Sequence, residues 1–238
     1  MPEERIVSQR VDPTRHLLMF DPRIFDKTRV DVIGCGAVGS RIAMEVAKLG
    51  IHNLHLWDDD VVGSHNIANQ LFGLPDVDRL KVEALAEHIL VGTGLTPTVH
   101  AVRVEGPVAL GKVVFLAVDT MEARRNIFRT SLRLKFTTDL VVETRMGAEE
   151  LRVYGFNPRS RNDTVAWEKT LTDDSRTVES ACRTRTTVGA TAEITAGFAV
   201  HRFLQWYRRD VVRDATTLEP PFEQGLMLRP LIVFANQS

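Results

Sequence analysis

Three glycines at a fixed spacing are the first feature of this chain that could do chemistry. Gly34, Gly36 and Gly39 lie between a β-branched strand at 29–33 and an apolar helical pattern. In such a turn the first glycine permits the tight bend, the second lets a phosphate approach the backbone, and the third lets the helix pack on the strand. Free N–H groups and the positive end of the helix dipole then face the anion. The loop predicts a nucleotide-binding crevice.

Charged side chains follow where later strands should end. Asp58 ends the second predicted strand, where a carboxylate reaches a pair of ribose hydroxyls. Asp119 follows the buried run at 113–118, and carboxyl ends of parallel strands meet at one crevice. A carboxylate beside a polyphosphate needs a cation between them. Asp119 is therefore predicted to bind magnesium, while Lys81 and Asn66 contact phosphates.

These residues also permit other interpretations. NAD-dependent dehydrogenases share the glycine loop and an acidic residue such as Asp58. Taken singly, Lys81 could be a solvated helix lysine and Asp119 the N-cap of the next helix. However, residues 57–70 are dense in carboxylate, amide and hydroxyl groups, which is unusual for a dehydrogenase. The combination favours ATP as the ligand.

Alternating strand and helix patterns predict the fold that must position this set. The predicted strands cover residues 29–33, 52–57, 98–104, 113–118, 140–144, 151–156 and 228–234. The first five alternate with helices, which favours an α/β, Rossmann-like, doubly wound and mostly parallel sheet. Residues 151–156 alternate as an antiparallel strand does, and a helix rich in small residues covers 188–207. We therefore expect antiparallel strands at the C-terminal end of the sheet.

The chain is expected to contain one nucleotide-binding domain with an N-terminal arm. Its 238 residues can bury one sizeable core. Residues 1–28 are polar, carry two Asp-Pro pairs and are predicted to form the arm, with short helical pieces. Residues 29–238 would form the domain. Within it, residues 157–187 are polar and are predicted to form a long irregular loop.

Composition excludes several classes of function. The 30 basic and 31 acidic residues leave no broad basic surface for nucleic acid. The longest weakly polar run, at 188–200, is too short to cross a bilayer, so no membrane partner is expected. Cys35 and Cys182 form no CxxC pair, so no zinc is expected, and two cysteines suit a reducing, cytoplasmic compartment. Cys35, inside the glycine loop, is predicted to be a small buried residue.

Together these motifs resemble the ThiF/MoeB family of the ubiquitin-activating-enzyme superfamily. The matching positions, within residues 29–125, are RVDVIGCGAVGS at 29–40, Asp58, Asp60, Asn66, Gln70, Lys81 and Asp119. The resemblance implies a ThiF-type adenylyltransferase. Such an enzyme uses ATP and magnesium to adenylate the C-terminal glycine of a small ubiquitin-like or sulfur-carrier protein ending in Gly-Gly.

The resemblance also implies roles for single residues. Asp58 would hold the ribose, with Asp60 in the same cofactor-binding set. Asn66, Gln70 and Lys81 would orient phosphates, and Asp119 would bind magnesium or shape the attack.

Members of the family are commonly homodimers, and an arginine from the partner's N-terminal arm reaches the ATP phosphates. Arg15 is the catalytic candidate for that role, with Arg10 as a second choice.

The chain departs from the family pattern at two features. Asn69 stands where the family usually has an arginine before the glutamine, so one phosphate charge is unmatched unless Arg79 or an arm arginine replaces it. The paired CxxC motifs of many members are absent, which indicates a short, zinc-free member. The first departure keeps open a degenerate ThiF-like scaffold that binds nucleotide without catalysis. An NAD-dependent oxidoreductase remains the other alternative.

Cys182 is a candidate for a covalent step. It precedes a helix rich in small residues and has arginines beside it that would stabilise a thiolate. By resemblance to thiol-using members, it would attack the acyl-adenylate to form a thioester, or take part in persulfide transfer. The alternative is a surface cysteine with no role.

Overall fold

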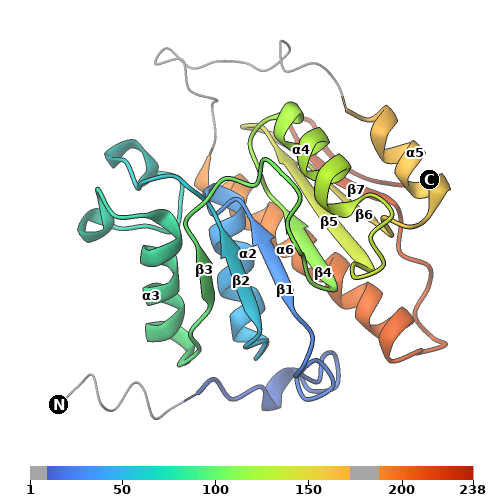
Figure 1. Cartoon of the computed structure of the whole chain (residues 1–238). Helices are drawn as coiled ribbons and strands as arrows, with labels where there is room; N and C mark the ends of the chain where they lie inside the picture. The colour runs from blue at the N-terminus through green and yellow to red at the C-terminus, as the bar shows by residue number, and fades with distance from the viewer. Residues whose placement is uncertain (1–9, 172–187, 238) are drawn as a thin grey trace.

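The computed structural model describes residues 10–171 and 188–237, which form one sheet with helices on both faces (Figure 1). Its strands are β1 (Val30–Ile33), β2 (Leu54–Trp57), β3 (Thr98–His100), β4 (Val113–Leu116), β5 (Leu140–Met146), β6 (Glu150–Phe156), β7 (Glu223–Leu228) and β8 (Leu231–Asn236). Its longer helices are α2 (Ala37–Lys48), α3 (Lys81–Thr93), α4 (Met121–Ile127), α5 (Arg161–Lys169) and α6 (Gly189–Trp206). Shorter helical segments are η1 (Thr14–His16), η2 (Ser64–Asn66), η3 (Leu74–Asp76), η4 (Phe128–Leu132) and η6 (Tyr207–Val211).

The eight strands lie in the order β3-β2-β1-β4-β5-β6-β7-β8. Strands β1 to β5 pair in parallel, and β6, β7 and β8 extend the sheet by antiparallel pairing. The predicted mostly parallel Rossmann-like sheet with antiparallel C-terminal strands is therefore confirmed. Because β1 pairs with both β2 and β4, the strand order reverses at β1, and this switch point opens a crevice at the carboxyl ends of the strands.

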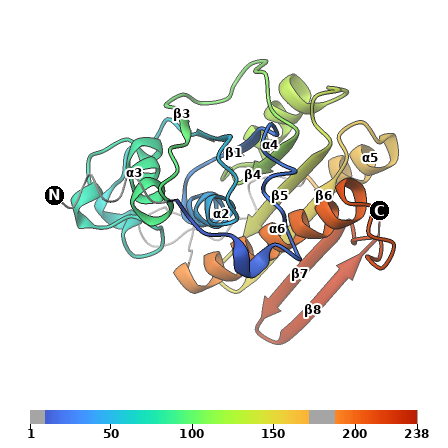
Figure 2. The same cartoon turned by 90° about the horizontal axis from the view of Figure 1, so that it is seen from below.

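Two apolar cores lie on the two faces of the sheet. The view from below shows helices on both faces (Figure 2). Helices α2, α3 and α6 cover one face, where side chains such as Ile42, Leu85 and Phe203 are fully buried. Helices α4 and α5 cover the other face, where Phe128 and Trp167 are fully buried. All four residues of β1 and of β4 are buried, as strands covered on both faces should be.

The sequence prediction is wrong for part of the long loop. Residues 161–169, inside the predicted irregular segment 157–187, form α5. The Ser160 side chain caps this helix by accepting a hydrogen bond from the Asp163 N–H, and Trp167 is buried against Phe128 and Phe156. One tryptophan among polar residues gave little periodic signal, which explains the error.

The end of the chain also differs from the prediction. In place of one strand at 228–234 there are two, β7 and β8, joined by a turn at Arg229 and Pro230. Strand β7 begins with Glu223 and Gln224 and contains Gly225, so its sequence carried no clear strand pattern. Pairing with β6 on one side and β8 on the other stabilises it.

The N-terminal segment packs on the main core before it enters β1. Phe20 and Phe25 are buried and contact the rings of Phe203 and Tyr207 at the end of α6. Within the described part of the chain, no helix is both long and apolar enough to cross a membrane.

Candidate nucleotide-binding site

The glycine loop joins β1 to α2 at the crevice, and its three glycines have different tasks. Gly34 has φ +89°, and a Cβ on it would lie 2.6 Å from the Ala117 carbonyl oxygen. A Cβ on Gly39 would lie 1.8 Å from the Gly34 carbonyl oxygen. Both are therefore required by close packing. A Cβ on Gly36 would meet nothing nearer than the Gln70 Nε2 at 4.0 Å, so the backbone at Gly36 faces open space.

The first turn of α2 offers N–H groups that the helix does not use. Gly36 is the N-cap and has no side chain to cap the helix, and no acidic residue lies in the first turn. The first intrahelical bond runs from the Ser40 N–H to the Gly36 carbonyl. The N–H groups of residues 37–39 thus point to the crevice with the positive end of the helix dipole, which suits an anion.

Asp58 is fixed against this loop by two backbone hydrogen bonds. Its Oδ2 accepts from the Cys35 N–H at 2.7 Å, and its Oδ1 accepts from the Asp60 N–H at 2.8 Å. Burial raises the pKa of Asp58, and the positive charge of Lys81 opposes that rise. A carboxylate has about four acceptor sites, so roughly two remain for a pair of hydroxyl groups.

Lys81 joins α3 to the end of β2. Its Nζ lies 2.8 Å from the Asp60 Oδ2, and its backbone N–H donates to the Asp60 carbonyl at 2.9 Å. The residue is only 7% exposed, so it is not the solvated helix lysine of the alternative interpretation. Its charge acts on both Asp58 and Cys35, which places it at the crevice.

The segment that carries Gln70 is folded by Asn66. The Asn66 Oδ1 accepts from the Gly63 N–H at 2.9 Å, and its backbone carbonyl accepts from the N–H groups of Asn69 and Gln70. The oxygen of the Asn66 side chain is therefore used in shaping the loop. Gln70 lies beside Gly36, and its Oε1 is buried without a hydrogen-bond partner among the described residues.

Asp119 lies in the turn between β4 and α4, and its side chain is exposed. The N-cap of α4 is Thr120, whose side chain accepts from the Ala123 N–H, so the interpretation of Asp119 as N-cap is wrong. The same turn begins at Ala117, which packs against Gly34. The turn with Asp119 therefore starts directly beside the glycine loop.

Carboxylate oxygens suited to magnesium are present at the crevice. Besides Asp119, the side chains of Asp58, Asp59 and Asp60 each offer an oxygen within 4.8 Å of the others. Asp60 pairs with Lys81, and Asp59 pairs with Arg103 at 3.2 Å. Magnesium prefers oxygen ligands, so the donor chemistry of this edge fits the ion.

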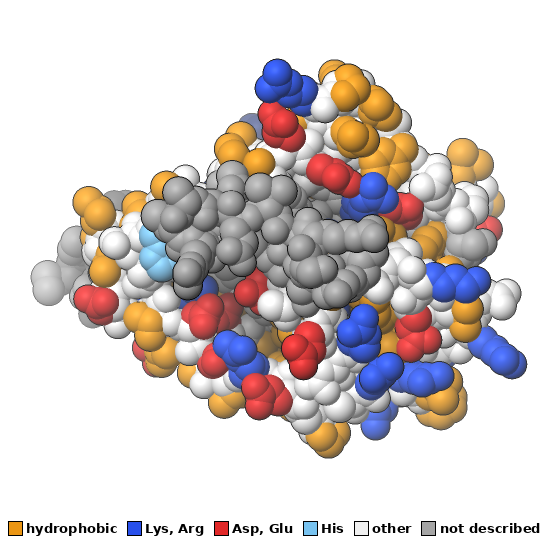
Figure 3. Space-filling model, turned by 90° about the horizontal axis from the view of Figure 1, so that it is seen from above, with side chains coloured by type: hydrophobic (Ala, Val, Ile, Leu, Met, Phe, Trp, Pro, Cys, Tyr) orange, Lys and Arg blue, Asp and Glu red, His pale blue; other side chains and the backbone are white. Residues whose placement is uncertain are grey.

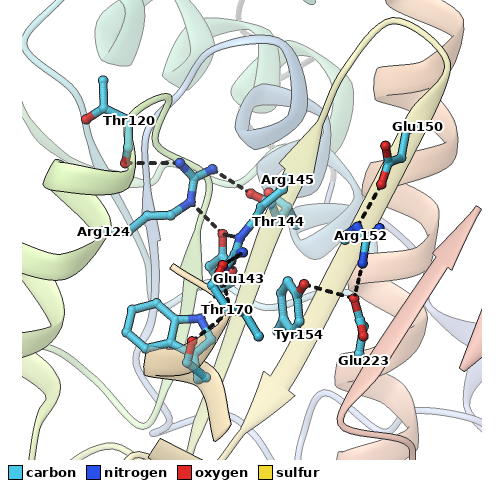
Figure 4. Close-up of polar contacts among 11 residues, drawn as sticks. Thr120, Arg124, Glu143, Thr144, Arg145, Glu150, Arg152, Tyr154, Thr170 and Glu223 are labelled. Atoms are coloured by element: carbon cyan, nitrogen blue, oxygen red, sulfur yellow. Dashed lines mark hydrogen bonds and ion pairs between the residues drawn. The ribbon is translucent and has the colours of Figure 1, made fainter. Parts of the chain in front are cut away.

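Sequence reasoning missed a buried charge network behind this edge (Figure 4). The fully buried Glu143 on β5 accepts from the Arg124 Nε at 2.5 Å, the Arg145 Nε at 3.0 Å and the Trp167 Nε1 at 3.2 Å. Burial alone would raise the pKa of Glu143, but Arg145 and Arg124 outweigh it and lower the pKa. The available signal was a charged residue inside an apolar strand.

This network fixes the two turns on either side of it. Arg124 donates from Nη1 to the Thr120 carbonyl at 3.0 Å, directly after Asp119. Arg145 donates to the carbonyl and the hydroxyl of Thr170, each at 2.8 Å, where α5 ends. The network therefore holds the turn that carries Asp119 in place.

The two arm arginines lie away from the crevice of their own chain, at the C-terminal ends of α2 and α3. The His16 ring lies 3.3 Å from the Leu49 carbonyl, which places the neighbouring, exposed Arg15 at the C-terminal end of that helix. The helix has 12 residues and is about 18 Å long. Arg10 is exposed too, and Val11 next to it bonds to the Thr93 carbonyl at the end of α3. Neither joins the crevice of its own chain.

The remaining candidates are placed as follows. Arg79 pairs with Asp76 and Glu87, so it does not replace the missing phosphate arginine. Cys35 is fully buried, and burial raises the pKa of its thiol, which agrees with the prediction of a small buried residue. Cys182 lies outside the described residues. The view from above shows acidic and basic side chains interspersed over this face of the molecule (Figure 3).

Comparison with known proteins agrees with this geometry. The model of the ThiF family matches residues 23–222. The sulfur carrier protein ThiS adenylyltransferase of Escherichia coli K12 is 28% identical over 176 residues, which is 68% of this chain and 65% of that protein. The NEDD8-activating enzyme E1 catalytic subunit of Dictyostelium discoideum is 33% identical over 105 residues, 41% of this chain and 23% of that protein. The chain thus spans less than two thirds of either relative.

Solved structures share the fold. E. coli MccB with ATP has a TM-score of 0.67 at 13% identity, covering 93% of this chain and 66% of MccB. The structure of PaaA has a TM-score of 0.67 at 17% identity, covering 95% of this chain and 78% of PaaA.

Proposed function

Because the chain belongs to the ThiF family, we propose that it is an ATP-dependent adenylyltransferase. Its substrate would be the C-terminal glycine carboxylate of a small ubiquitin-like or sulfur-carrier protein ending in Gly-Gly. The observation that carries the proposal is the pairing of an open glycine loop with a fixed acceptor: the Asp58 carboxylate bonds to the Cys35 N–H inside the loop. This pairing supports a ribose acceptor beside an anion site.

The groups at the crevice would each bind a different part of ATP. The N–H groups at the start of α2 bind phosphate oxygens, Asp58 accepts from the ribose hydroxyls, and Lys81 balances charge on the phosphates. A carboxylate oxygen of the protein substrate attacks the α-phosphorus. The bond to the β-phosphate oxygen breaks, and pyrophosphate leaves with the electron pair. Positioning and charge neutralisation provide the rate, without a covalent enzyme intermediate.

Magnesium would be held by Asp119 and would supply positive charge against the pyrophosphate. Asp119 is suited to this task because it is exposed and because its own turn is fixed by Arg124. We further propose a homodimer in which Arg15 or Arg10 of the partner reaches the phosphates, since both lie away from the crevice of their own chain. The Cys182 thiolate would attack the acyl-adenylate, forming a thioester and releasing AMP, or would take sulfane sulfur from a persulfide donor that leaves as a thiolate.

A second function is supported by one observation. Asn69 replaces the family arginine, and Arg79, the substitute considered from the sequence, is already paired with Asp76 and Glu87. A scaffold that binds nucleotide without catalysis would tolerate this loss.

ATP–pyrophosphate exchange with a small Gly-Gly-ended partner decides between these functions. Exchange in the wild type that falls by about a hundredfold in Asp119→Ala supports the enzyme. The matched control is Glu122→Ala, an exposed acid in the first turn of α4, which should retain exchange. ATP binding without exchange would support the scaffold, and NADH binding without ATP binding would support an oxidoreductase.

A further inference from the structure

A cavity of about 590 Å³ opens at the end of the sheet opposite to the glycine loop. Its lining includes Lys112, just before β4, Leu140, the first residue of β5, and Phe156, the last residue of the antiparallel β6. These positions mark the amino ends of the parallel strands, whereas nucleotide crevices lie at the carboxyl ends. The cavity is therefore separate from the candidate nucleotide site. Its volume is in the range of small-molecule sites.

Arg202 of α6 lines this cavity and is buried, and the carboxylates of Asp210, Asp163 and Glu219 act on its charge only from a distance. It is 6% exposed, and its Nη2 donates to the Gly155 carbonyl at 2.9 Å. Its Nε and Nη1 have no hydrogen-bond partner among the described residues, and no described carboxylate forms an ion pair with it. Burial lowers the pKa of Arg202 to about 10, so the guanidinium still carries its charge at neutral pH. A buried charge without a partner is costly, which calls for an explanation.

The neighbouring strand is shaped to admit this guanidinium. A Cβ on Gly155 would lie 2.1 Å from the Arg202 Nε. Glycine weakens a strand interior and often marks the close approach of another group. Gly155 in the buried part of β6 thus leaves the space that Arg202 fills.

Most other charges around the cavity are already paired. Lys112 lies 3.3 Å from Asp139, which also pairs with Arg159. Arg209 lies 3.0 Å from Glu219. These pairs neutralise the rim and leave Arg202 at its centre.

The carboxylates that remain do not meet Arg202. Asp163 accepts hydrogen bonds from the Ser160 hydroxyl and the Asn157 N–H, and Asp210 is exposed. Arg213, also exposed, adds a further positive charge at the rim. The ring of Trp206 supplies an apolar wall.

We propose that this cavity binds a small molecule that carries an oxyanion, a carboxylate or a phosphate group, against Arg202, with its apolar part against Trp206. A carboxylate or phosphate in the cavity would give the buried guanidinium the close counter-charge that no described carboxylate supplies. A cavity of about 590 Å³ has the size of a small-molecule site, which favours a small molecule as the ligand.

Benzoate, phenyl phosphate and inorganic phosphate are suitable probes, because they separate carboxylate from phosphate and test the apolar wall. Binding is measured by tryptophan fluorescence and by the rise in melting temperature. We expect saturable binding of at least one probe, with Trp206→Phe removing most of the fluorescence change. Arg202→Gln should weaken that binding roughly tenfold or more.

Two further variants, Lys81→Gln and Arg213→Gln, test which of the two sites the probe occupies. Lys81→Gln alters only the glycine-loop crevice and should leave probe binding unchanged, whereas Arg213→Gln, an exposed change that spares the fold, should weaken it. If Arg202→Gln fails to fold, Arg213→Gln and Trp206→Phe decide the question. The proposal is wrong if no probe saturates the wild type at about 10 mM, if binding is lost in Lys81→Gln instead, or if the folded Arg202→Gln and Arg213→Gln proteins bind as tightly as the wild type.

Discussion

The glycine-loop crevice and the Glu143 network lie next to each other, yet their carboxylates have different hydrogen-bond partners. In the network, the buried Glu143 carboxylate accepts hydrogen bonds from two arginines and a tryptophan. In the crevice, Asp58 accepts only two backbone N–H bonds, and the first-turn N–H groups of α2 have no partner within the helix. The pKa of Glu143 is lowered and that of Asp58 is raised.

The comparison separates charged groups that stabilise the fold from charged groups that can bind a ligand. A network whose groups are all paired gains rigidity but has nothing left to offer a ligand. A crevice with open donors and acceptors binds a ligand because the protein itself leaves the bonds unmade. The two regions are joined at Thr120, whose carbonyl accepts from Arg124.

The largest expected effect comes from breaking the network. Glu143→Gln leaves the charges of Arg124 and Arg145 buried without a carboxylate, so the free energy of unfolding should fall by about 3–5 kcal/mol. Urea denaturation measures it. Glu150→Gln is the control, because Glu150 is a half-exposed partner of Arg152, and its loss should cost about 1 kcal/mol or less. Equal losses in both variants would contradict the structural role of Glu143.

A variant in the crevice should lose affinity for ATP but lose little stability. Lys81→Gln should weaken ATP binding roughly ten- to a hundredfold through loss of a charge-assisted contact. The free energy of unfolding should fall by less than in Glu143→Gln, because the partner carboxylate of Asp60 is 54% exposed and regains water. Calorimetric titration with ATP and a melting curve test both parts. The control is Lys48→Gln at the far end of α2, whose ion pair is exposed on both sides; a similar loss of ATP affinity there would refute the assignment.

The smallest effects concern pH and have opposite signs in the two regions. Because the folded-state pKa of Glu143 is lowered, its stabilising contribution is complete above the unfolded value, about 4.3, and is lost as pH falls through the folded pKa. Because the folded-state pKa of Asp58 is raised, its ionised form is unfavourable in the folded state, and this cost is relieved as pH falls through that pKa. Carboxyl NMR titration should find Glu143 below and Asp58 above their ordinary values. If the pKa values of Glu143 and Asp58 were shifted in the same direction, the proposed difference between the two regions would be wrong.

The sequence predicted the crevice better than the network, for physical reasons. The loop lies within one β-α-β unit, and it acts through backbone geometry at Gly34, Gly36 and Gly39, with Asp58 close by. The positions of these residues in the sequence are therefore enough to predict their arrangement in space. Arg145 lies two residues from Glu143 on β5, but Arg124 comes from α4 and reaches Glu143 only because β5 pairs with β4. No local pattern encodes that meeting.

Other elements were missed where tertiary contacts override local preference. Helix α5 depends on the burial of Trp167, and β7 depends on its two neighbouring strands. Arg202 is a charged residue in a largely apolar helix, and only the packing of α6 on β6 brings it against Gly155.

Calorimetric titration of the wild type and of Gly36→Val with magnesium-ATP and with NADH tests the nucleotide site most directly. Gly36 is the loop glycine at which an added Cβ meets open space, so the valine variant should still fold, with a lower melting temperature from the less favourable N-cap. We predict that the wild type binds ATP and not NADH, and that Gly36→Val loses ATP binding. Binding of NADH by the wild type, or undiminished ATP binding by a folded Gly36→Val protein, would contradict the proposal that this crevice holds a triphosphate.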